Sequence, residues 1–269
     1  MGILVLIGAL GVAAMFLIRK PSNNRSWNVD QKILPKAEIH GNLVTVRNVR
    51  NFTYQSTIEY TPGYYDATYD VDNLKRIYYV VEPFGSIKGA HTFLSFEFEG
   101  NQFVSVSIEI RKREGESFKE WKAVLPYYEL MYVVADEKDV IKLRSNFRKD
   151  IVFLYPVKAT PEARKAIFLD YMARVNKLYD KPEFYNLFTN TCTTNILDTI
   201  NRATEKKINW SYEVMFPSLS DEYAMKLGLL DTNLSLEEAR NMYNINEKAE
   251  AAANDPDFSL KIREGALWP

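Results

Sequence analysis

The one cysteine of this chain, Cys192, is the residue best suited to nucleophilic chemistry. It lies in NTCTTNILDTI, where polar residues run into apolar ones at helical spacing, so a helix is predicted to begin there, capped by Asn190 or Thr191. The free N–H groups and the dipole at a helix start favour a thiolate, the reactive form of cysteine. The alternative is a small buried apolar residue, as lone cysteines often are.

A nucleophilic thiol needs a base, and the chain has two histidines. His40 lies in AEIHGN, an apparent turn, and is expected on the surface. His91 begins AHTFLSFEF, whose alternation predicts a strand, and its side chain is either a base or a satisfied, half-buried strand residue. The polar residues that could orient its imidazole are Ser95, Glu97 and Glu109.

The relation between His91 and Glu109 depends on a predicted hairpin. Residues 90–98 and 103–111 alternate like strands and are separated by EGNQ, a strong hairpin signal. A four-residue loop places His91 opposite Ile110, whereas a shift of one residue places it opposite Glu109. Both registers remain open from the sequence.

Other polar or aromatic groups have a functional and a structural interpretation. Tyr65 belongs to the tyrosine-rich stretch 60–70, which is either a ligand platform or part of the core. Arg111 begins RKREGE, which suits a phosphate-containing head group or a solvated loop. Three carboxylates form either a paired-carboxylate site or the acidic first turn of a helix: Asp136, Glu137 and Asp139.

Composition narrows the possible classes of protein. A single cysteine excludes an internal disulfide and a cysteine-based zinc site, so no metal or cofactor is implied. The net charge of −1 provides no basic footprint for nucleic acid. Aromatic residues make up 13% of the chain, which indicates a β-rich core and a surface near lipid or a ligand cleft.

The pattern of elements predicts an α+β fold with an antiparallel sheet packed on helices. Strands are expected at 43–52, 77–83, 90–98, 103–111, 129–137 and 151–157. Helices are expected at 136–147, at 161–179 with Thr160 as N-cap and Pro161 at the first position, and at 192–202. Ser235 and Glu238 form a capping box at the start of a later helix.

The first 18 residues carry no charge and would span roughly 27 Å as a helix, about the thickness of a bilayer core. We expect residues 1–20 to form an uncleaved membrane anchor, with a signal peptide as the alternative. Arg19 and Lys20 favour a cytoplasmic position for the domain after the anchor. The remaining chain is predicted to form one domain over 21–215 and a helical extension over 216–269 packed on it.

Seven segments in order, over roughly residues 25–202, resemble the Lnb N-terminal periplasmic domain family. They are RSWNVDQ, AEIHGNLVTVRNVRNFTY, YYDATYDVDNL, AHTFLSFEF, VSVSIEIRKREGE, YELMYVVADEKDVIKLRSNFR and PEFYNLFTNTCTTNI. This family is similar to circularly permuted papain-like, NlpC-type cysteine enzymes, in which the histidine precedes the cysteine. The resemblance therefore implies Cys192 as nucleophile, His91 as base and Glu109 as the third catalytic residue, with Ser95, Arg111 and Tyr65 as candidates for binding substrate.

The resemblance also implies an activity. The family is associated with N-acylation of bacterial lipoproteins, which implies a thiol acyltransferase that takes an acyl chain from a phospholipid and passes it to a lipoprotein amine. The resemblance also implies a catalytic domain in the periplasm, held by a single inner-membrane span. This orientation is opposite to the one that Arg19 and Lys20 favour. The alternatives are an NlpC-type cell-wall peptidase or amidase, and a non-catalytic envelope binding module.

Overall fold

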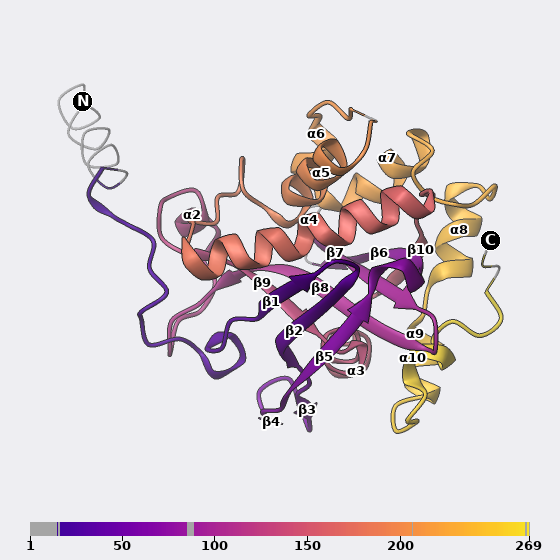
Figure 1. Ribbon diagram of the computed structural model, residues 1–269, viewed down its shortest axis with the longest axis horizontal. Helices are drawn as coiled ribbons and strands as arrows, with labels where there is room; N and C mark the ends of the chain where they lie inside the picture. Colours follow the sequence, from indigo (N-terminus) through magenta and orange to yellow (C-terminus); the bar gives the residue numbers. More distant parts are fainter. Residues whose placement is uncertain (1–14, 16, 85–88, 206, 267, 269) are drawn as a thin grey trace.

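A mixed β-sheet separates two layers of helices in the computed structural model, which describes residues 15, 17–84, 89–205, 207–266 and 268 (Figure 1). The strand order is β1-β2-β9-β8-β7-β6-β10, with β5 paired to β2, and β3 and β4 form a separate small ladder. The strands are β1 (Lys36–His40), β2 (Leu43–Arg50), β3 (Thr53–Tyr54), β4 (Tyr60–Thr61), β5 (Tyr64–Asp70), β6 (Leu74–Phe84), β7 (Gly89–Phe98), β8 (Gln102–Arg111), β9 (Glu129–Ala135) and β10 (Phe153–Pro156).

The α+β prediction is confirmed, but the sheet is not purely antiparallel. β2 runs parallel to β9, through the pair Arg50↔Ala135, while the other paired strands of this sheet are antiparallel. A parallel pair needs a long crossover, and here the chain between β2 and β9 forms most of the sheet. No short-range pattern in the sequence reports such a pairing.

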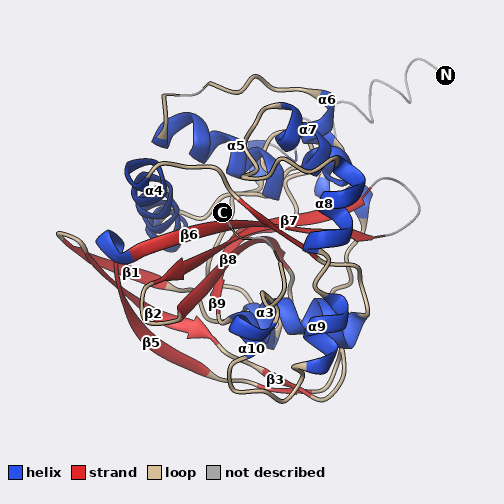
Figure 2. Ribbon diagram, turned by 90° about the vertical axis from the view of Figure 1, so that its right-hand side faces the viewer, coloured by secondary structure: helices blue, strands red, loops and turns tan. Residues whose placement is uncertain are grey.

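The helices cover both faces of the sheet. They are α2 (Glu120–Ala123), α3 (Glu137–Lys142), α4 (Pro161–Asp180), α5 (Cys192–Ala203), α6 (Tyr212–Met215), α7 (Ser220–Lys226), α8 (Leu236–Tyr243), α9 (Asn246–Ala251) and α10 (Phe258–Lys261). Figure 2 shows α4 and α5 on one side of the sheet and α3, α9 and α10 on the other. We refer to these sides as the α5 face and the α3 face.

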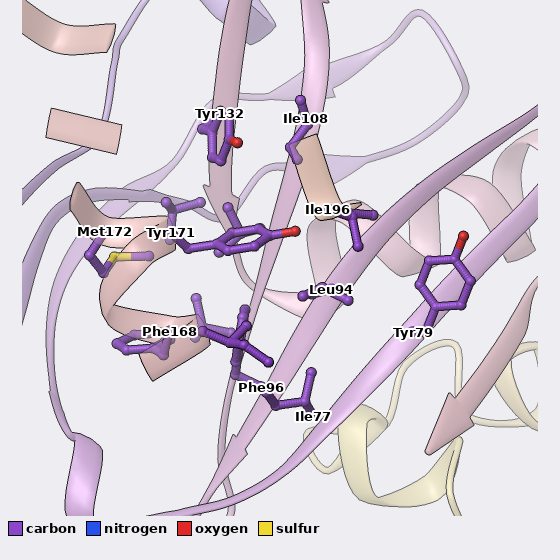
Figure 3. Close-up of a cluster of buried hydrophobic side chains, with 14 of the residues drawn as sticks. Ile77, Tyr79, Leu94, Phe96, Ile108, Tyr132, Phe168, Tyr171, Met172 and Ile196 are labelled. Atoms are coloured by element: carbon purple, nitrogen blue, oxygen red, sulfur yellow. The ribbon is translucent and has the colours of Figure 1, made fainter. Parts of the chain in front are cut away.

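Strand alternation assigns each residue of β7 to one face. Leu94 and Phe96 belong to the cluster on the α5 face, together with Phe168 of α4 (Figure 3). Phe93 belongs to the cluster on the α3 face. The ring of Phe168 meets that of Phe96 edge-on at 5.0 Å, and such aromatic pairs contribute about 0.5–1.5 kcal/mol beyond the area that they bury.

Local capping signals fix where the main helices begin. The Thr160 side chain accepts from the backbone N–H of Ala163, as predicted, and α4 starts at the next residue. The predicted helix 136–147 is instead the short α3 followed by a π-helical segment, η3 (Leu143–Arg148). η3 ends where Lys149 takes a left-handed conformation, with φ of 60°.

The chain after residue 216 completes the sheet's hydrophobic layers. Leu230 and Tyr243 are buried in the cluster on the α5 face, and Ile262 in the cluster on the α3 face. Trp268 packs against Tyr243 with ring centroids 5.5 Å apart. Residues after 216 therefore pack against both faces of the sheet.

The predicted anchor lies mostly outside the described residues, which include only 15 and 17–20 of it. Among the residues that the structure describes, no helix has the length and apolar character needed to cross a membrane.

Candidate functional site

Cys192 is the first residue of α5, and the helix start is built by its own sequence. The Thr191 side chain accepts from the Thr194 N–H at 3.2 Å, and the Thr194 hydroxyl accepts from the Thr191 N–H at 2.7 Å. This capping box occupies the N–H of the third helical residue. The N–H groups of Cys192 and Thr193 belong to the first turn of the helix and have no acceptor within it.

The thiol is buried on the α5 face of the sheet. Cys192 is 5% exposed, and its Sγ lies 3.8 Å from the Thr193 Oγ1. Tyrosines surround it: burial raises the pKa values of Tyr79, Tyr171 and Tyr185, and the nearby Cys192 adds to each rise. These phenols therefore stay protonated at neutral pH and can donate hydrogen bonds.

An apolar cavity of about 250 Å³ runs along α5 from the residue after Cys192. α5 contributes residues at helical spacing to its wall: Thr193, Ile196, Leu197, Ile200 and Thr204. The sheet contributes Ile77, Tyr79 and Leu94, all labelled in Figure 3. The C-terminal helices α6 and α7 close it with Val214 and Ala224. The cavity thus combines strands and helices that only the tertiary fold brings together.

His91 belongs to a polar network on the α3 face. Its Nε2 lies 2.7 Å from the Ser107 Oγ, and that hydroxyl donates to the Glu109 Oε1 at 2.8 Å. A serine hydroxyl has one proton, so Ser107 must accept the second bond. His91 therefore carries its proton on Nε2 and keeps the lone pair on Nδ1.

Arg144 of η3 holds the network in place. Its Nη2 donates to the Glu109 Oε1 at 3.0 Å and its Nε donates to the Glu82 Oε2 at 2.7 Å. The guanidinium also lies over the ring of Phe93, 5.2 Å from its centroid, and Phe93 stacks on His91. The π-helical segment thus places one cation between two carboxylates on the sheet.

Burial and this cation set the protonation of the network. Burial lowers the pKa of His91 to about 3, and the positive charges of Arg144 and Arg148 act in the same direction. Burial raises the pKa of Glu82 to about 7 against the opposing effect of Arg144. Burial also disfavours ionised Glu109, but Arg144 and other neighbours outweigh it and hold the pKa below its ordinary value. His91 is therefore neutral at pH 7, and its pKa is far from that of an efficient base at that pH.

The structure brings His91 and Glu109 together but not His91 and Cys192. The ladder between the two hairpin strands ends at the pair Phe93↔Ser107, and this register, extended by two residues, corresponds to the predicted one that sets His91 opposite Glu109. Thr92, on the other side of β7, meets α5: its Oγ1 is 3.3 Å from the Thr193 Oγ1. His91 and Cys192 therefore lie on opposite faces of the sheet.

The three candidates for substrate binding have structural contacts in the folded chain. Arg111 is 2% exposed, and its guanidinium donates to the Gln31 and Lys32 carbonyls and to the Asn23 side chain. Ser95 is fully buried and donates to Glu137. The Tyr65 hydroxyl donates to Asp136 at 3.1 Å. These bonds tie each side chain to the framework of the domain.

His40 and the three carboxylates at 136, 137 and 139 have the structural positions given as the alternative to a functional role. His40 ends β1 on the surface. Asp136 caps α3, with Glu137 and Asp139 in its first turn. Asp139 receives a bidentate pair of bonds from Arg50, and Glu137 receives bonds from Arg263. Among the described residues there is no group of three or more histidine, cysteine or acidic side chains able to hold a metal ion.

Sequence reasoning missed Ser107 and Arg144. Ser107 shares a sheet face with His91 and Glu109, so strand alternation could have identified it once the register was known. Arg144 comes from a π-helical segment 35 residues after Glu109, and no local pattern links the two.

Comparison with known proteins gives one result. The sequence profile of the Lnb N-terminal periplasmic domain family matches residues 60–227, well over half of the chain. The chain belongs to this family. The match includes His91, Glu109 and Cys192, and it identifies the matched region as a periplasmic domain. No curated protein and no solved structure matches the chain.

Proposed function

We propose that this member of the Lnb N-terminal domain family is a thiol acyltransferase with a permuted papain-like, NlpC-type site, anchored in the bacterial inner membrane by residues 1–20. It would take a fatty acyl chain from a phospholipid and pass it to the N-terminal amine of a lipoprotein. The observation that carries the proposal is the apolar cavity along α5, lined from Thr193, the residue after Cys192, which suits an acyl chain and offers few polar contacts to a peptide.

The proposed reaction has two balanced steps. The Cys192 thiolate attacks the ester carbonyl of the phospholipid, the C–O bond breaks, and the lysophospholipid leaves with a proton. The lipoprotein amine then attacks the thioester carbonyl, a C–N bond forms, the C–S bond breaks, and the thiol recovers a proton. The N–H groups of Cys192 and Thr193 would stabilise the oxyanion in both steps.

The N-terminus of α5 would itself help to stabilise a Cys192 thiolate, through its backbone N–H groups and dipole. The family resemblance assigns the proton transfer to His91. This part of the proposal requires the imidazole to leave Ser107 and reach the α5 face, since the two side chains lie on opposite faces of the sheet. Ser107 and Glu109 would then be positioning residues for the imidazole.

The test detects the thioester directly. Full-length protein is reconstituted in vesicles whose phospholipid acyl chains carry a heavy isotope, and its intact mass is measured before and after neutral hydroxylamine. We expect a hydroxylamine-sensitive mass gain equal to one acyl chain, absent in Cys192→Ala. A synthetic diacylglyceryl-cysteine peptide should discharge it and gain the same chain on its amine. Absence of both products would contradict the proposal.

A matched pair of variants on α5 tests the cavity. Leu197 lines the cavity, whereas the exposed Asp198, about 100° further round the helix, lines the separate polar hollow described below. Leu197→Trp should fill the acyl site and lower thioester formation at least tenfold or restrict it to shorter chains. Asp198→Trp adds the same bulk outside the cavity and should leave the reaction near the wild-type rate. Equal effects of the two would contradict an acyl site here.

A cell-wall peptidase is the second candidate, and a polar hollow favours it. This hollow, of about 540 Å³, adjoins the start of α5 and includes Arg174, Glu183 and Asn190. Turnover of purified muropeptides that depends on Cys192, without any acyl thioester, would support a peptidase over the acyltransferase. A non-catalytic module would show neither reaction.

A further inference from the structure

Three exposed aromatic side chains lie at α2 and in the loop that precedes α5. Trp121 is 62% exposed, Phe188 is 48% exposed and Phe118 is 46% exposed. Lys122 follows Trp121, and Lys119 precedes it by two residues with Glu120 between them. The Lys122 ammonium lies 5.9 Å from the Trp121 ring centroid and 3.6 Å from the Glu116 carboxylate. We call the three aromatic residues and the two lysines the aromatic–basic face. Large exposed aromatic groups on a folded domain indicate a surface that contacts something apolar.

Backbone contacts fix the two parts of this face to each other. The Leu187 N–H donates to the Ala123 carbonyl at 3.0 Å. The Asn186 side chain donates to the Val124 carbonyl, also at 3.0 Å. The loop that carries Phe188 is therefore attached to the end of α2, which carries Trp121. The same loop leads to Cys192 four residues later.

The uncharged N-terminal segment ends at this face. The Arg19 guanidinium lies 4.6 Å from the Tyr127 ring centroid, and the Lys122 ammonium lies 4.0 Å from the same centroid. Just before Arg19, Leu17 is 82% exposed and Ile18 is 76% exposed. Figure 1 shows this part of the chain beside α2, at the opposite end of the molecule from the C-terminus.

We infer that the aromatic–basic face rests on the interface of an anionic phospholipid bilayer, into which Trp121, Phe118 and Phe188 insert. Aromatic rings prefer the boundary between head groups and acyl chains, and nearby lysines are attracted to lipid phosphates. The end of the uncharged segment fixes this face next to the membrane. The inference rests on the proposed membrane anchor. It places the loop before Cys192 at the lipid surface, within reach of the acyl donor.

The test measures the depth of tryptophan in the bilayer and does not depend on activity. Full-length protein is reconstituted in phosphatidylethanolamine–phosphatidylglycerol vesicles with bromine on the acyl chains, which quenches only nearby indoles. Trp121→Phe is compared with Trp210→Phe, since Trp210 is 55% exposed but lies between α5 and α6. Both changes keep an aromatic ring, and near-ultraviolet circular dichroism checks the fold.

We expect Trp121→Phe to remove at least half of the bromine-quenched fluorescence and Trp210→Phe to leave it unchanged. Equal quenching in wild type and Trp121→Phe would overturn the inference, as would a loss confined to Trp210→Phe. Quenching that is absent while the protein forms stable dimers through Trp121 would assign the face to a second copy and also overturn it. Failure of the protein to float with vesicles would instead contradict the anchor itself.

Discussion

The imidazole of His91 should remain neutral in the folded protein far below its usual titration range. Burial, with Arg144 and Arg148 nearby, lowers its pKa to about 3 from an ordinary 6.5. At pH 5 about 1% of folded molecules and about 97% of unfolded molecules would carry this proton. The unfolded chain therefore binds more protons between pH 6.5 and 3, so His91 lowers stability as the pH falls. The loss from pH 7 to pH 5 is about 2 kcal/mol.

Two measurements check this value. Because the chain has two histidines, the single imidazole signal of a His40→Gln variant belongs to His91. Its proton and nitrogen chemical shifts should stay constant from pH 8 to pH 5 and report the Nε2-protonated tautomer. In urea unfolding, His91→Gln keeps an N–H donor for Ser107 but cannot titrate. The unfolding free energy of wild type minus that of the variant should fall by about 2 kcal/mol between pH 7 and pH 5.

A midpoint between pH 6 and 7 for the His91 signal would refute the reasoning, since it would require an imidazole that water or an unopposed carboxylate stabilises in its charged form. An unchanged difference in unfolding free energy between pH 7 and pH 5 would refute it independently. A His91 signal that shifts when Cys192 is alkylated would instead show that the imidazole reaches the thiol, as the assigned base role requires.

Two further variants test how the site is held. Arg144→Met leaves the buried Glu109 without its ion-pair partner and leaves Glu82 with only the more exposed Arg148, 3.5 Å away, so we expect urea unfolding to show a loss of about 3–5 kcal/mol. Arg47→Met, which removes an exposed cation, should change stability much less because water screens its ion pairs. Thr191→Ala removes the cap of α5 and should cost about 1 kcal/mol in thermal unfolding.

Strong local patterns in the sequence predicted the elements that carry the site. Residues 90–98 and 103–111 alternate, and the structure pairs them as β7 and β8. The cap and proline at Thr160 and Pro161 predicted the start of α4, and the polar run before Cys192 predicted the start of α5. These features depend on nearest neighbours, so the sequence contains them directly.

The features that the sequence did not predict depend on contacts between distant segments. The parallel pairing of β2 with β9 requires a crossover through most of the sheet, and the change from α3 to a π-helical segment at Leu143 has no recognised local signal. Arg144 enters the His91 network only because of that segment. Strand alternation predicted that His91 and Ser95 share one face of the sheet. It could not predict that α5 packs on the other face.

The position of α5 limits which groups can activate the thiol. On the α5 face, alternation leaves β7 with Ala90, Thr92 and Leu94 nearest the helix, and the polar contact made there is between the hydroxyls of Thr92 and Thr193. A hydroxyl is too weak a base to hold a thiol proton at neutral pH. In the proposed acyltransferase, a histidine-assisted step would therefore require His91 to give up Ser107 and change faces. Moving the imidazole would break its hydrogen bond to Ser107, which Glu109 and Arg144 hold in place. A substitution that weakens this network should therefore change the proposed proton transfer, while the cavity on the α5 face stays intact.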